Sequence, residues 1–265
     1  MTFKMKPLSC DPARIKGMSE RLIVSHYENN YGGAVKRLNV IEEKLAELDY
    51  DKAAGFLING LKREQLIAMN SMILHELFFD GLGEQSEPDA VLREAIVRDF
   101  GSYERWRAEF VAMGKALGGG SGWVLLSWSP RDRKLVNQWA SDHCHTLAGG
   151  TPILALDMYE HSYHIDFGAK PAAYVEAFMA AIRWNNSDRL FSDASKHRGH
   201  SRTISPIRRF ACVYRPLFLR LALFWPQVPS GPKKLIGSRL TLSLVESRPC
   251  QPTFTVTVSH EPIFQ

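Results

Sequence analysis

The sequence has no uninterrupted apolar run of 18 or more residues, which argues against a membrane-spanning helix. Residues 1–7 contain no apolar core of the kind that a secretory signal carries. Cysteine is scarce: Cys10, Cys144, Cys212 and Cys250 are scattered and form no C-x-x-C pair, so a disulfide framework is not expected. We therefore expect a cytoplasmic protein with free thiols.

Charge is unevenly distributed along the 265 residues. The whole chain carries a net charge of +5, yet residues 196–265 hold 11 Lys and Arg against two Glu, a net +9, and 8 of the 14 prolines. The preceding residues, with 22 basic and 26 acidic side chains, carry −4. This change indicates that residues 195–265 are a basic, proline-rich tail that differs in nature from the rest.

Three interpretations of the tail stay open. Its prolines and charge favour a disordered or loosely structured extension. Its apolar stretch 210–225, with interspersed arginines, fits contact with a membrane surface or with nucleic acid. The third is that the segment is not selected coding sequence, as after a shift of reading frame. For the chain as a whole we expect no nucleic-acid partner and no membrane span.

Hydrophobic periodicity predicts the remaining elements. Helices are expected over 18–48, with Gly32-Gly33 as a bend or interruption, and over 62–79, 90–99, 102–117 and 171–184, the last being the final helix. Short strands are expected over 123–128, 134–139 and 152–156, and residues 240–245 and 253–258 also have strand-type composition. The order predicts an α+β fold: an N-terminal helical hairpin (1–88), then a small antiparallel three-stranded sheet flanked by helices (89–194).

Candidate metal ligands stand at three separate places. Asp157 and His161 lie four residues apart just after a predicted strand, a spacing that lets a carboxylate and an imidazole reach one ion. Alone this pair is a weak signal, because a loop Asp near a surface His is common. His26 and His75 each lie among apolar residues on a predicted helix, and two such histidines together with the downstream pair are rarer.

These residues and several motifs resemble the iron/manganese superoxide dismutases over residues 1 to about 194. The family takes one His from each of its first two helices, and an Asp and a His from a D-x-W-E-H-A-Y-Y segment. The matching features here are His26, His75, D-M-Y-E-H-S-Y-H from Asp157, G-S-G-W at 120–123, R-W-N at 183–185, Pro7-Leu8 and Asn39. The resemblance implies a helical N-terminal domain and an α/β C-terminal domain with the metal between them.

The resemblance also implies a function. The expected reaction converts superoxide to oxygen and hydrogen peroxide at a single Fe or Mn ion, with a slight preference here for iron. In the family a Gln or His usually hydrogen-bonds the solvent at the metal, and His143 aligns with that position. Ser71 stands where iron enzymes often keep their Gln, so the resemblance implies that His143 is the solvent partner. Glu160 matches the Glu that reaches the partner's metal-binding His, which implies a homodimer.

Four positions depart from the family pattern. In the family, a His, a Tyr, a Trp and a Tyr line the funnel through which substrate reaches the metal and relay protons, and they form the substrate gate. Here they are replaced by Asn30, Ala34, Tyr159 and His164, so the gate differs from that of the family. We expect His164 to meet Asn30 across the dimer and Tyr31 to fill part of the space that Ala34 leaves, so His143, Tyr31 and His164 are the candidate catalytic residues.

Two alternatives remain beside the superoxide dismutase interpretation. The rebuilt gate motivates a non-catalytic or slow metal-binding paralogue of the same fold. Three histidines and an aspartate do not exclude a hydrolytic zinc enzyme. Basic residues near the motifs, among them Lys36, Arg37 and Lys170, are candidates for attracting an anionic substrate, although a solvated face is the better explanation for each one alone.

Overall fold

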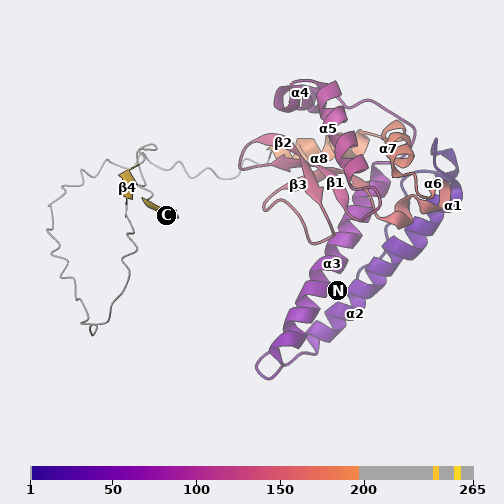
Figure 1. The fold of residues 1–265 in the computed structure, drawn as a ribbon. Helices are drawn as coiled ribbons and strands as arrows, with labels where there is room; N and C mark the ends of the chain where they lie inside the picture. Colours follow the sequence, from indigo (N-terminus) through magenta and orange to yellow (C-terminus); the bar gives the residue numbers. More distant parts are fainter. Residues whose placement is uncertain (1, 197–240, 245–253, 258–265) are drawn as a thin grey trace, which may run out of the picture. The chain divides into compact units, whose positions relative to one another are not determined.

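The computed structural model describes residues 2–196, 241–244 and 254–257 (Figure 1). Contacts divide the chain into two compact units, Met1–Ser205 and Pro206–Gln265. In the second unit, β4 (Thr241–Leu244) pairs antiparallel with β5 (Phe254–Thr257), in agreement with the strand-type composition there. The apolar stretch 210–225, Cys212 and Cys250 lie outside the described residues. No helix in the described ranges has both the length and the apolar character to cross a membrane.

A long helical hairpin forms the N-terminal part of the first unit. It follows a short turn, η1 (Pro12–Arg14), and begins with α1 (Glu20–Ser25), capped by the Ser19 hydroxyl, which accepts from the Leu22 N–H. The π-helical segment η2 (His26–Tyr31) and α2 (Gly32–Ala46) continue it, and α3 (Gly55–Asp80) returns alongside α2 (Figure 1). α3 begins seven residues before the predicted start, and its first turns contain Gly55 and Gly60, which favour a helix little.

The predicted break at Gly32-Gly33 is wrong. Gly32 has helical dihedral angles, φ −60° and ψ −36°, and the helix runs through it. A Cβ on Gly32 would lie 3.1 Å from the Met5 sulfur, so this glycine permits the close approach of the N-terminal segment. The irregularity lies one turn earlier, in η2, and π-helical turns of this kind occur frequently at functional sites.

The three-stranded sheet has the predicted strands and antiparallel pairing. β1 (Trp123–Ser129) is central, between β2 (Lys134–Ala140) and β3 (Thr151–Asp157), and is buried along its whole length. The register places Trp123 opposite Asp157. Gly122 enters β1 with φ 135°, and a Cβ there would lie 2.2 Å from the Ala140 carbonyl oxygen, so only glycine fits. The sheet and hairpin together confirm the α+β prediction.

Helices cover the sheet, and their number exceeds the prediction. α4 (Ala90–Phe100), α5 (Tyr103–Ala116), η3 (Glu160–Ser162), α6 (His164–Phe167), α7 (Pro171–Ala180) and α8 (Asn185–Lys196) follow one another in the chain. The helix expected over 171–184 is confirmed from Pro171, but it ends at Ala180, and it is not the last helix because α8 follows. Between them, Ile182 forms an isolated antiparallel bridge with Leu82, and the Arg183 N–H donates to Gly81 at 2.8 Å. These backbone contacts of residues 182 and 183 with the end of α3 end α7 at Ala180, although the local sequence is compatible with a longer helix.

Candidate metal centre

Four side chains from the hairpin and the sheet converge in the interior of the first unit. The ligand atoms of His26, His75, Asp157 and His161 all lie within 4.8 Å of one another. The Asp157 Oδ2 lies 3.2 Å from His26 Nε2, 3.6 Å from His75 Nε2 and 3.3 Å from His161 Nε2. Three ring nitrogens from η2, α3 and η3 therefore face one carboxylate oxygen at the end of β3.

Hydrogen bonds at the rear of two of these groups fix which atoms face the centre. His75 Nδ1 donates to the Ser71 carbonyl at 2.6 Å, one helical turn back, so its Nε2 carries the lone pair. The Tyr159 N–H donates to Asp157 Oδ1 at 2.8 Å, which leaves Oδ2 toward the imidazoles. Within the described part of the chain, His75 Nε2 and both ring nitrogens of His26 are buried without a hydrogen-bond partner, and buried polar atoms of this kind require one.

Electrostatics keep His26, His75 and Asp157 in the states that bind a cation. Burial lowers the pKa of His75 to about 3, and burial also lowers the pKa of His26, so both rings are neutral near pH 7. Burial alone would raise the pKa of Asp157, but the His161 and His26 imidazoles outweigh it and hold that pKa below its usual range. Three imidazole nitrogens and one carboxylate fit a borderline-hard divalent or trivalent ion such as iron or manganese.

His143 lies beside this cluster with its ring held on two sides. The Trp123 indole N–H donates to His143 Nδ1 at 3.0 Å, so in the neutral ring the proton resides on Nε2. The ring stacks on Tyr159 with centroids 4.7 Å apart and an interplanar angle of 9°, and Tyr159 in turn stacks on His161 at 5.4 Å. The His143 and His75 centroids are 6.1 Å apart.

Tyr31 contacts the cluster through its ring rather than its hydroxyl. Its centroid lies 6.4 Å from that of His75, and the side chain is fully buried. The hydroxyl donates to Glu76 Oε1 at 3.0 Å and accepts from the Lys6 N–H at 2.8 Å. The suggestion that Tyr31 fills space beside Ala34 stays a prediction.

The remaining predicted residues lie outside the group of four. His164 opens α6 with an exposed side chain, Glu160 is exposed, Asn30 is half-buried in η2, and Ala34 is buried in α2. Cys10 and Cys144 are free, half-buried thiols, as expected, and burial raises the pKa of each. No motif in the sequence marks Trp123 as the partner of His143, and none marks Asn70, whose amide donates to the His143 carbonyl at 2.6 Å.

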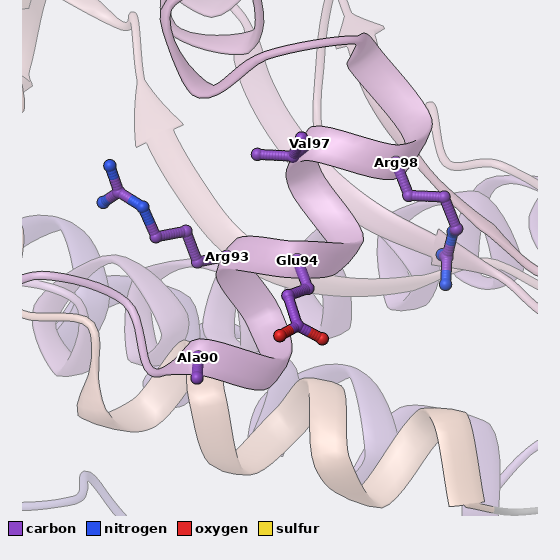
Figure 2. A pocket seen from close by; sticks show the side chains of 5 residues that line it. All are labelled: Ala90, Arg93, Glu94, Val97 and Arg98. Carbon is purple, nitrogen blue, oxygen red and sulfur yellow. The ribbon is translucent and has the colours of Figure 1, made fainter.

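A separate surface pocket lies on α4 and involves none of these residues. Ala90, Arg93, Glu94, Val97 and Arg98 line it (Figure 2). Both arginines have partners outside the pocket: the Arg93 guanidinium lies over the Tyr103 ring at 4.9 Å, and Arg98 pairs with Asp99 at 2.7 Å. We assign no ligand to it.

The fold and the cluster define an α+β protein with a candidate mononuclear metal centre, and comparison with known proteins identifies its family. Residues 88–189 match the family model of the C-terminal domain of iron/manganese superoxide dismutases. The chain is 69% identical over 194 residues to superoxide dismutase [Fe] of Cupriavidus metallidurans, covering 73% of this chain and 98% of that protein.

More distant relatives include enzymes named for each metal. Superoxide dismutase [Mn] 1 of Halobacterium salinarum is 34% identical over 202 residues, covering 73% of this chain and 97% of the relative. Superoxide dismutase [Fe] of Aquifex pyrophilus is 31% identical over 193 residues, covering 70% and 89%. The chain therefore belongs to the iron/manganese superoxide dismutase family, a family of metal-dependent oxidoreductases.

Proposed function

We propose that this chain converts two superoxide ions and two protons to oxygen and hydrogen peroxide at one iron ion, held by His26, His75, Asp157 and His161. The observation that carries the proposal is the convergence of three imidazole Nε2 atoms on Asp157 Oδ2 within a family whose members catalyse this reaction. When bound, the ion supplies the one-electron chemistry by accepting an electron from one superoxide and giving one to the next.

Iron is proposed rather than manganese on similarity alone. The relative that is 69% identical is named for iron, whereas the Halobacterium relative at 34% identity is named for manganese. The four metal-facing side chains do not discriminate, because both ions accept nitrogen and carboxylate donors.

His143 is proposed to hold the solvent molecule that serves the protonation steps. Since Trp123 occupies Nδ1, the neutral ring presents its Nε2–H as a donor. Burial lowers the pKa of His143, so the ring stays neutral near pH 7 and does not add a positive charge beside the ion. The Tyr159 ring, stacked on His143, fixes its plane, and this gives the Tyr that replaces the family's Trp a definite role.

The gate and the dimer complete the proposal. Glu160 follows Tyr159 directly and is exposed in the single chain, as expected of a side chain that reaches the partner's His161 in a two-fold dimer. His164 is likewise exposed and available to meet Asn30 of the partner subunit. A cytoplasmic location stays a prediction from the sequence.

The test is superoxide dismutation by the purified full chain, loaded separately with iron and with manganese, with metal content measured on the same samples. We expect one ion per subunit and rapid turnover in the iron form. An Asp157→Asn variant, which keeps the shape of the side chain but not its charge, should lose metal. A protein that binds one ion per subunit yet is slow with both metals would overturn the proposal and favour a non-catalytic paralogue.

A further inference from the structure

The loop between β2 and β3 carries His143, and it is tied to the helical hairpin by one long-range hydrogen bond. The Asn70 side-chain Nδ2 donates to the His143 carbonyl oxygen at 2.6 Å, between residues 73 positions apart. Asn70 is half-buried on α3, five residues before His75. The bond therefore joins the backbone of His143 to the helix that carries one of the four clustered side chains.

On the sheet side, both the ring and the backbone of His143 have partners, because the Tyr159 hydroxyl accepts from the His143 N–H. Trp123 and Tyr159 hold the ring, as described above, but both belong to the sheet side of the structure. The other bonds of the loop are local, such as the Cys144 N–H to Asp142 Oδ1 at 2.6 Å, or come from the sheet side, such as the Ser121 hydroxyl to the Ser141 carbonyl at 3.2 Å. These bonds fix His143 relative to the sheet, whereas the Asn70 bond fixes it relative to the helix that carries His75.

One stretch of α3 orients both groups. The Ser71 carbonyl fixes the His75 ring through Nδ1, and the adjacent residue, Asn70, fixes the His143 backbone. Because α3 is a continuous helix, the two constraints share one rigid frame, which suits a site that tolerates only small displacements.

We propose that Asn70 is a positioning residue for the reaction, acting through His143 by holding its backbone at a fixed distance from the His75 side of the centre. The inference rests on the proposed role of His143. The proposed role requires a hydrogen-bond donor at position 70, because this side chain meets the carbonyl oxygen of His143. Asn70→Asp keeps the shape but presents an acceptor to that carbonyl, so it should disturb the loop more than Asn70→Ala does.

The experiment compares the iron-loaded full chain with Asn70→Asp, Asn70→Ala and the matched control Asn59→Asp, which changes an exposed Asn on the same helix. The readouts are kcat, its pH profile and the reduction potential of the bound iron. We expect kcat to fall about 10-fold to 100-fold in the Asn70 variants, with a shifted potential, the range typical when a residue supporting a metal site is removed. Asn59→Asp should match the unaltered protein.

A double-mutant cycle separates a positioning role from general destabilisation. In a His143→Ala background, Asn70→Asp should have no further effect, because the residue it positions is gone. In the metal-free protein, the carbonyl ¹³C shift of His143 should change in the Asn70 variants, because this carbonyl loses its donor. If Asn70→Asp fails to fold, the same comparisons are made with Asn70→Ala.

Two results would overturn the inference about Asn70 while leaving the proposed role of His143 intact. One is an Asn70 variant with unaltered kcat and reduction potential. The other is an effect of Asn70→Asp on kcat that is as large in the His143→Ala background as in the unaltered protein. An unaltered potential and kcat in His143→Ala alone would instead remove the proposed role of His143, and this inference with it. The dismutase activity would stand in either case.

Discussion

Replacing Tyr31 with Phe removes one buried hydroxyl and should destabilise the protein without abolishing activity. The hydroxyl accepts from the Lys6 N–H at 2.8 Å and donates to Glu76 Oε1 at 3.0 Å. Burial raises the pKa of Tyr31 to about 12, so the hydroxyl keeps its proton at any ordinary assay pH. The aromatic ring that contacts His75 is retained in Phe.

The expected loss follows from the two bonds. A neutral hydrogen bond contributes about 1 kcal/mol net, and one to a charged group about 1.5–3 kcal/mol. Glu76 also pairs with the Lys6 ammonium, which compensates in part, so we expect a loss of about 2–3 kcal/mol. Relaxation of the N-terminal segment is limited, because Asn39 bonds both the N–H and the carbonyl of Phe3.

The assay is urea unfolding of the metal-free full chain, followed by circular dichroism, since bound metal would add its own stabilisation. Tyr50→Phe is the matched control: Tyr50 is 54% exposed, its hydroxyl makes a 3.3 Å bond to Leu45, and the change should stay within about 0.5 kcal/mol. A Tyr31→Phe loss no larger than the control would refute the reasoning. Full stability with strongly reduced turnover would instead show that the hydroxyl acts in catalysis.

Two further predictions follow from the cluster. The pKa of His75 is about 3 in the folded chain and 6.5 ordinarily, so below pH 6.5 the unfolded chain gains a proton that the folded chain does not. As the pH falls from 6.5 toward 3, this group should lower the free energy of unfolding of the metal-free protein by about 1.4 kcal/mol per pH unit. Unfolding curves of His75→Gln should therefore show a shallower dependence of stability on pH. Glu160→Ala should weaken the dimer and lower iron content together, measured by sedimentation and metal analysis, because it removes the proposed partner of His161 across the interface; an unchanged dimer and metal content would contradict the cross-subunit role.

The sequence determined which four side chains form the cluster and most of the elements, because the motifs and the periodicity that mark them are local. Asp157 and His161 are four residues apart at a strand end, and they meet in the structure at 3.3 Å. His26 and His75 lie on helices whose apolar periodicity predicts burial, and both are buried. Motif order was sufficient to indicate the family before any contact was known.

Only the tertiary structure decided the contacts that support this set. The bond from Asn70 to His143 spans 73 positions, and the bonds of Tyr31 to Lys6 and Glu76 span 25 and 45. No local pattern signals these pairs, because they arise when the loop, the N-terminal segment and α3 are brought together by the packing of the whole unit. The end of α7 at Ala180 has the same origin, since its cause is a bridge to Leu82, far away in the sequence. Local sequence thus specifies which side chains are available at the centre, whereas long-range packing fixes their orientation and the residues that hold them in place.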